Sequence, residues 1–192
     1  MKSKLLIFNF LLCSIMAFGQ SLTESWEAEQ NYRQTGMMVL GGWAVANIAS
    51  GLVMRSNTTG VDSRFWEMNA LWNGVNLALA GFGYMSAAKL GTDGTALELY
   101  QAQVSMDKIF LFNAGLDIGY IALGAWMTER SKNVTKNADL WKGYGRSIML
   151  QGAFLFAFDI AMVLIHKSII IGDGMTLSFN VAPGGFGAVL QF

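Results

Sequence analysis

Four long apolar stretches constrain this chain more than any other feature of its sequence. They cover about residues 35–54, 66–88, 109–128 and 147–166 and hold very few charged side chains. A helix needs about 20 predominantly apolar residues to cross a bilayer, so each stretch is long enough to span one. Charged residues make up only 14% of the chain, against roughly a quarter in soluble domains. The sequence therefore predicts an all-α, four-helix transmembrane bundle over residues 35–167. Four buried helices of a soluble protein are the alternative, but too few polar faces remain to cover them.

The N-terminus has the pattern of a secretory signal peptide. Lys2 and Lys4 precede a short apolar run, and Ala17 and Gly19 form a small-x-small cleavage site. We expect residues 1–19 to be removed, which leaves residues 20–34 as an outer segment before the bundle; an uncleaved signal anchor is the alternative. The single cysteine, Cys13, would leave with the signal. The mature chain would then have neither a disulfide nor a cysteine-based metal site.

The distribution of basic residues predicts the orientation of the bundle. Residues 55–67 and 129–146 hold seven basic side chains, namely Arg55, Arg64, Arg130, Lys132, Lys136, Lys142 and Arg146. The segments on the other side hold only Arg33, Lys89, Lys108 and Lys167. Loops rich in Lys and Arg stay in the cytoplasm. We therefore expect a multi-pass protein of the bacterial cytoplasmic (inner) membrane, with both mature termini in the periplasm.

The C-terminal tail, residues 168–192, differs in kind from the bundle. Leu177, Phe179 and Val181 alternate with smaller or polar residues, and a Pro-Gly-Gly turn at residues 183–185 precedes a second alternating run. Apolar residues with a period of two around such a turn indicate a β-hairpin. The sequence predicts a short outer hairpin that caps the bundle or docks a partner strand.

Each apolar stretch carries amide or carboxyl side chains at helical spacing. Asn69, Asn73 and Asn76 share one face, as do Asn113 and Asp117. Polar groups inside a bilayer are expensive and face the protein interior or a cavity. Four such faces can meet only in the middle of the bundle. The candidate site, for a ligand or an ion path, is Asn47, Asn73, Asn76, Asn113, Asp117, Gln151 and Asp159.

Three interpretations of this polar seam stay open. The first is packing, in which the side chains hydrogen-bond across helices and fix their register. The second is a cavity for a lipid or small apolar ligand. The third is a proton or cation path through Asp117 and Asp159, which lie at similar depths and could be neighbours.

The second and fourth stretches resemble each other in sequence. Arg64 and Asn69 stand where Arg146 and Gln151 stand, although Asn76 and Asp159 are then out of step by one residue. This similarity indicates two helical hairpins of common descent, with chance similarity between apolar stretches as the alternative.

Other chemistry has little support in the sequence. No nucleophile motif accompanies the carboxyl groups, so we expect neither an enzyme nor catalytic residues. The lone His166 is expected to be an interfacial side chain, and we expect no metal and no cofactor. The formal net charge is zero, and nucleic-acid binding requires a basic face.

Two blocks near the fourth stretch resemble a known signature. They read Trp-Lys-Gly-Tyr-Gly-Arg at residues 141–146 and Gln-Gly-Ala-Phe-Leu-Phe-Ala-Phe-Asp at residues 151–159. They are similar to an uncharacterised family of small Bacteroidetes-type membrane proteins, a domain of unknown function. That family combines a signal peptide, four spans and a Gly/Phe-rich tail. The resemblance implies an envelope membrane protein and no known activity.

Taken together, these features predict a non-enzymatic membrane protein with a structural or accessory role, which binds a lipid or small apolar ligand in a polar-lined core. The alternative is a small proton or cation conductor based on Asp117 and Asp159. The expected partners are membrane lipids and a second copy of the chain or another envelope protein.

Overall fold

The computed structural model describes residues 22–172, 176–182 and 185–191, with side chains from residue 22 to residue 166. Four long helices form the body: α2 (Leu22–Asn57), α3 (Gly60–Ala88), α4 (Ala96–Arg130) and α5 (Ala138–Gly172). A short 3-10 turn, η1 (Ser131–Asn133), follows α4. The predicted signal peptide and Cys13 lie outside the described residues.

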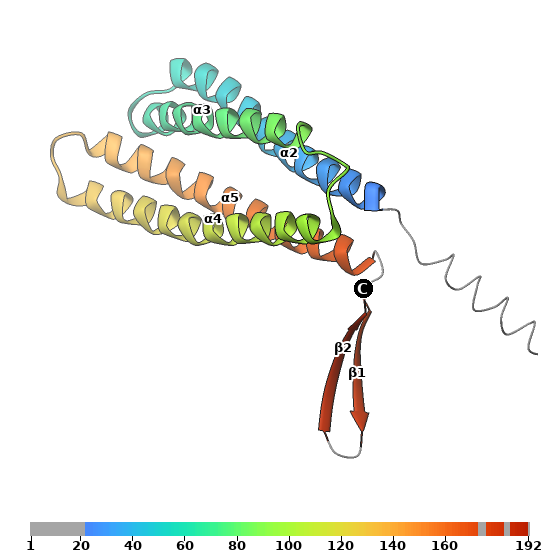
Figure 1. The fold of residues 1–192 in the computed structure, drawn as a ribbon. Helices are drawn as coiled ribbons and strands as arrows, with labels where there is room; N and C mark the ends of the chain where they lie inside the picture. The colour runs from blue at the N-terminus through green and yellow to red at the C-terminus, as the bar shows by residue number, and fades with distance from the viewer. Residues whose placement is uncertain (1–21, 173–175, 183–184, 192) are drawn as a thin grey trace, which may run out of the picture.

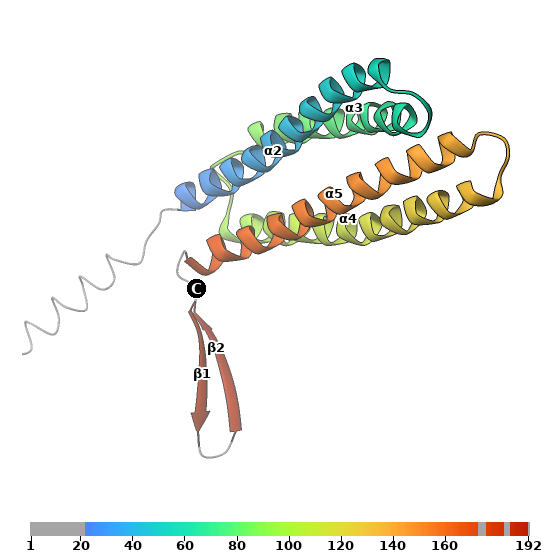
Figure 2. The ribbon, with the colours of Figure 1, turned by 180° about the vertical axis from the view of Figure 1, so that it is seen from behind.

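The helices are arranged as two hairpins, α2–α3 and α4–α5 (Figure 1). The hairpins join mainly where α3 packs against α5, whereas α2 meets α4 and α5 only locally and α3 barely touches α4. Seen from behind, the α2–α3 turn and the α4–α5 turn lie at the same end of the bundle (Figure 2). The contact between α3 and α4 is made by long side chains, such as the rings of Trp72 and Tyr120.

The ends of two helices have clear local causes. Gly60 begins α3 with a φ of 59°, a left-handed conformation that glycine adopts without strain, and the chain therefore reverses between α2 and α3 through Thr58 and Thr59. At the start of α4, the Thr95 hydroxyl accepts a hydrogen bond from the Glu98 backbone N–H, and the Glu98 carboxylate accepts one from the Thr95 backbone N–H. This capping box satisfies two backbone donors that would otherwise be unpaired.

Small residues allow α4 and α5 to approach closely. A Cβ atom added to Gly124 would lie 2.5 Å from the backbone oxygen of Gly145, and one added to Gly152 would lie 2.9 Å from the backbone oxygen of Asp117. Helices in membranes associate through such small residues because lipid supplies no hydrophobic drive between them. Any larger side chain here would push the helices apart.

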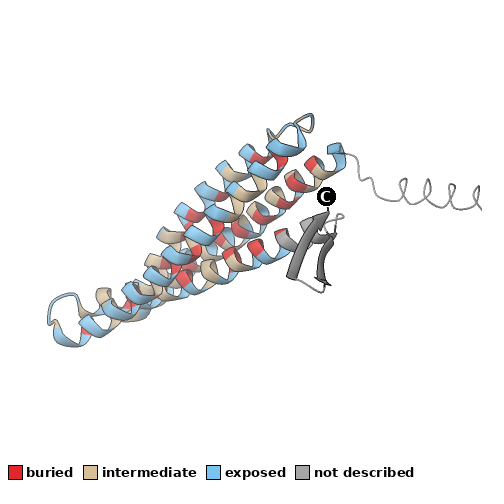
Figure 3. Cartoon of the chain, turned by 60° about the horizontal axis from the view of Figure 1, so that its bottom comes forward, coloured by how far each residue is buried: buried red, intermediate tan, exposed pale blue. Residues whose placement is uncertain are grey.

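The bundle buries polar side chains and exposes apolar ones. Figure 3 shows buried residues as stripes on the inward sides of the helices, with exposed residues on the outer sides. Asn69, Asn73 and Gln151 have no exposed surface, whereas Phe82 and Phe112 are 69% and 68% exposed. Large exposed apolar surfaces mark contact with another apolar phase. Such a surface suits a bundle surrounded by lipid.

Among the residues that the structure describes, three helices, α2, α4 and α5, are long and apolar enough to cross a membrane. The prediction of four equivalent apolar spans is therefore corrected for α3. Its three asparagines lower the mean hydropathy, but they lie on its buried face. The opposite face is apolar and exposed at Leu71 and Phe82.

The predicted fold class combined the bundle with a C-terminal β-hairpin, and that combination is wrong: the folded body is all-α. After α5, the strands β1 (Thr176–Ala182) and β2 (Gly185–Gln191) pair only with each other, with Thr176 opposite Gln191. They add no sheet to the bundle, and Figure 1 shows them pointing away from it rather than capping it. Alternating residues favour local pairing, but two strands have no third partner with which to build a core.

Candidate functional site

A chain of buried amides crosses the bundle where α2, α3 and α5 meet. Trp43 Nε1 donates to Gln151 Oε1 over 3.0 Å, and Gln151 Nε2 donates to Asn69 Oδ1 over 2.6 Å. Asn69 Nδ2 in turn donates to Asn47 Oδ1 over 3.0 Å. These bonds join residues from three helices in one continuous network. The network fixes the rotation and depth of each helix, because a shift of one helix would leave a buried amide unpaired.

The same network continues along α3. Asn73 Nδ2 donates to the backbone oxygen of Asn69 over 2.8 Å, and Asn76 Nδ2 donates to Asn73 Oδ1 over 3.3 Å. Asn76 is the last member of this series, and it also lines a cavity. The amide series thus leads from the packed centre of the bundle to an empty space.

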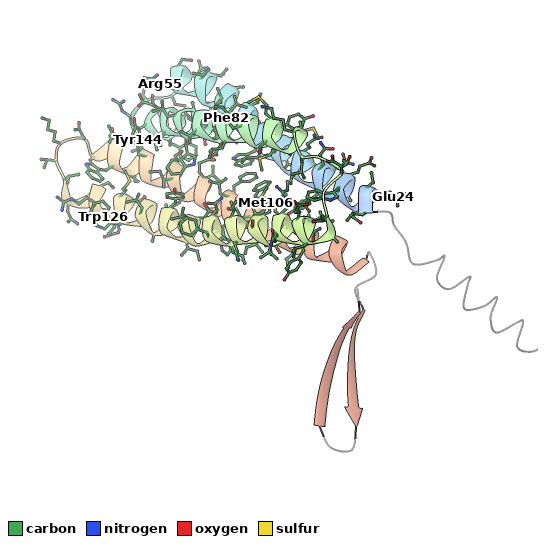
Figure 4. The ribbon with its side chains drawn as sticks, in the orientation of Figure 1. Glu24, Arg55, Phe82, Met106, Trp126 and Tyr144 are labelled. Atoms are coloured by element: carbon green, nitrogen blue, oxygen red, sulfur yellow. The ribbon has the colours of Figure 1, made fainter. Side chains whose placement is uncertain are left out.

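That cavity, of about 340 Å3, lies between α3 and α4, with α5 and α2 behind it. We call it the α3–α4 cavity. Its walls are mostly apolar: Met37, Leu40, Val75, Leu79, Met106, Ile109, Phe110, Leu116, Leu155 and Phe158. In Figure 4, the labelled Met106 lies in the region between α4 and the α2–α3 hairpin. Ligand pockets measure about 300–1,000 Å3, and apolar walls with a few polar groups are typical of them.

Two carboxyl groups, those of Asp117 on α4 and Asp159 on α5, line the cavity. They are 3% and 5% exposed and interact with each other. Asp117 Oδ2 is buried and has no hydrogen-bond partner in the part of the chain that the structure describes. An unpaired buried oxygen costs free energy, so this atom is available to accept a hydrogen bond from a group placed in the cavity.

Two contacts between hairpins frame the cavity. The rings of Trp72 on α3 and Tyr120 on α4 meet edge to face with centroids 4.9 Å apart, and both line the cavity. Arg33 on α2 also lines it and donates from Nη2 to the backbone oxygen of Ala102 on α4 over 2.9 Å. One aromatic contact and one hydrogen bond thus hold the two hairpins on either side of the space.

A second set of polar side chains lies apart from the amide network. It consists of Glu29, Arg33, Asp107 and His166, and we call it the Glu29–His166 cluster. His166 Nε2 lies 2.7 Å from Glu29 Oε2, and His166 Nδ1 lies 2.6 Å from Asp107 Oδ1. Arg33 Nε donates to the other Glu29 oxygen over 2.7 Å. An imidazole that donates from both nitrogens carries a positive charge. Two cations would then balance two carboxylates, as buried charges require.

His166, expected to be an interfacial side chain, is buried within the bundle, with 1% of its surface exposed. Tyr32 stacks on its ring with centroids 4.6 Å apart. The sequence placed Glu29 and Asp107 outside the spans, but α2 and α4 extend beyond bilayer length and bring both carboxylates to His166. The available signal was the spacing of four residues between Glu29 and Arg33, which indicates a helix there.

The structure separates the predicted site residues into two groups. Asn76, Asn113, Asp117 and Asp159 line the α3–α4 cavity. Asn47, Asn73 and Gln151 belong to the amide network. Asn69, which was not a candidate, connects that network. Among the described residues, no group of three or more His, Cys, Asp or Glu side chains is arranged to hold a metal ion.

Comparison with known proteins identifies the family of this chain. No curated protein and no solved structure matches it. A family model described as "Family of unknown function (DUF6992)" matches residues 39–160. That range takes in the amide network, both cavity carboxyl groups and the turn between the hairpins. The chain therefore belongs to the DUF6992 family, a family of unknown function.

Proposed function

We propose that this protein is a non-enzymatic, multi-pass protein of the bacterial cytoplasmic membrane that holds a lipid chain or small apolar ligand in the α3–α4 cavity. The resemblance to Bacteroidetes-type envelope proteins extends the proposal to that group of bacteria. Two observations on the described residues support the membrane role. Three helices are long and apolar enough to cross a membrane, and many large apolar side chains are exposed. Membrane lipids are the partners that such a surface implies.

The basic residues support the orientation in which the two hairpin turns face the cytoplasm. Arg55, Trp126 and Tyr144 lie toward the end of the bundle that carries both turns, and Glu24 lies at the other end (Figure 4). At the first of these ends Arg55 and Arg64 both pair with Glu67, over 2.9 Å and 2.7 Å. An end rich in Lys and Arg is retained in the cytoplasm.

The observation that carries the ligand proposal is the α3–α4 cavity itself. Val75 and Leu79 on α3 and Ile109 on α4 line it and are each more than half exposed. A surface-exposed lining of this kind offers a lateral way in from the acyl-chain region. The walls suit an apolar chain, and the carboxyl groups behind them give it a polar end to contact.

The conductor alternative has less support. A path for protons or cations needs groups that can exchange partners beyond Asp117 and Asp159. Gln151 and Asn69, which continue the seam, are fully buried and bonded to each other and to Trp43 and Asn47. Such a network favours fixed packing over conduction.

Native mass spectrometry of the purified protein tests the ligand proposal. We expect the wild type to retain a bound lipid or metabolite after the detergent is removed. Leu79→Trp, which fills the cavity, should lose it. Leu71→Trp is the matched control, because Leu71 lies on the same helix, is equally exposed and does not line the cavity. A wild type with no bound mass, or equal occupancy in both variants, would refute the proposal.

A further inference from the structure

We infer that the α3–α4 cavity selects a ligand that carries a protonated amino group on an apolar body. This inference rests on the proposed function and names the chemical class of the ligand. It starts from Asp117 and Asp159, which line the same cavity, interact with each other and are almost fully buried. Asp117 Oδ2 has no hydrogen-bond partner among the described residues.

Among the residues that line the cavity, no basic side chain is available to pair with these two carboxyl groups. No lysine lines the cavity, and the one arginine that the structure places there, Arg33, already bonds to Glu29 and to the backbone of Ala102. Two carboxyl groups side by side in a medium of low dielectric do not both ionise readily, because their negative charges would repel each other. A cation placed against both would relieve that repulsion and supply the missing partner of Asp117 Oδ2.

The aromatic residues favour an organic cation. Trp72 and Tyr120 line the cavity beside the carboxyl groups, since Tyr120 stands one helical turn after Asp117. A cation within about 6 Å of the face of such a ring is attracted by the ring's quadrupole. Asn76 also lines the cavity, and an amide carbonyl oxygen is a group that can accept a hydrogen bond from an ammonium N–H.

The apolar walls decide between kinds of cation. A metal ion would need three or more ligands of suitable type, and no described group of His, Cys, Asp and Glu provides them. A hydrated inorganic ion would leave Leu79, Met106 and Phe110 against water. An apolar amine satisfies both parts of the cavity, because its chain contacts the walls while its ammonium group contacts Asp117 and Asp159. An anionic amphiphile would be repelled.

The test compares three probes of equal chain length on the full, purified protein: dodecylamine, dodecanol and dodecanoic acid. Native mass spectrometry measures the occupancy of each, and phosphatidylethanolamine is measured in parallel. We expect dodecylamine to bind about tenfold more tightly than dodecanol, which corresponds to one charge-assisted contact, and dodecanoic acid to bind most weakly. Binding of phosphatidylethanolamine as well would identify a lipid headgroup as the source of the amine, and its failure to bind would identify a single-chain amine.

Asp117→Asn and Asp159→Asn keep the shape and remove the charge, so each should abolish the preference for the amine while dodecanol still binds. Asp62→Asn is the control, since the Asp62 side chain is 66% exposed and pairs only loosely with Arg146 at 3.8 Å. Equal binding of all three probes to the wild type would overturn the inference and leave an apolar site. Binding of none would overturn the proposed function as well. The comparison of the three probes on the wild type tests the inference even where a variant fails to fold.

Discussion

Gln151 on α5 donates a 2.6 Å hydrogen bond to Asn69 on α3, and neither side chain has any exposed surface. The internal similarity of the sequence places these two residues at equivalent positions of the second and fourth apolar stretches. Equivalent positions therefore meet at the interface where the two hairpins join. The bond lies at the centre of the amide network and is one of the polar links between the hairpins.

Replacing Gln151 by leucine should destabilise the bundle by about 1–3 kcal/mol, because it leaves the buried Asn69 oxygen and the Trp43 N–H without partners. Unfolding followed by tryptophan fluorescence in detergent measures the change. Gln101→Leu is the control, because Gln101 is exposed. A double-mutant cycle with Asn69→Leu should show coupling, and independent effects would contradict the network.

Glu29→Gln should destabilise the protein by about 3 kcal/mol at neutral pH, because breaking a buried ion pair leaves the remaining charges uncompensated. Both Glu29 oxygens are used, one by Arg33 and one by His166. Glu27→Gln, on the exposed side of the same helix, should have almost no effect. Equal midpoints of thermal unfolding for the two variants would refute the structural role of the Glu29–His166 cluster.

Gly124→Ala should loosen the contact between α4 and α5 and cost about 1–3 kcal/mol by overpacking. The added methyl group would meet the backbone of Gly145, which cannot rotate away as a side chain could. Gly119→Ala tests the same change one or two turns earlier on α4, where nothing lies within 4 Å of the added atom. We expect Gly119→Ala to leave the unfolding temperature unchanged or raise it, and a loss equal to that of Gly124→Ala would argue against the close approach.

The proposed orientation is tested with single cysteines in a Cys13→Ser background, because the chain has no other cysteine. Ser56→Cys, beside the α2–α3 turn, should react with a membrane-impermeant maleimide only in permeabilised cells. Asp93→Cys, in the loop between α3 and α4, should react in intact cells. Both positions are exposed, so the reverse labelling pattern would place the basic end outside.

The sequence predicted those parts of the bundle that depend on local spacing. Asn69, Asn73 and Asn76 fall on one face at intervals of three and four residues, and the structure buries all three. Asp117 and Asp159 were placed at similar depths by counting along their helices, and the structure brings them together at the cavity. Helical period and depth suffice for such inferences because both are fixed by the geometry of the helix.

The Glu29–His166 cluster could not be predicted in this way. Glu29 and Asp107 lie 137 and 59 residues from His166 along the chain. They meet it only because α2 and α4 continue past the ends of their apolar stretches. Bilayer thickness sets the length of an apolar stretch, but not the length of the helix that contains it. The division of the seam into a bonded network and a cavity depends in the same way on how the hairpins pack.

The three asparagines of α3 also bear on how the chain is assembled as it is made. The ribosome delivers α3 well before α5, so Asn69 reaches the membrane before Gln151 exists to bond with it. A helix whose inward face is rich in amides partitions poorly into lipid when it is alone. We therefore expect α3 to enter the bilayer as a pair with α2, and the integration of this hairpin to become permanent only after the last helix has been synthesised.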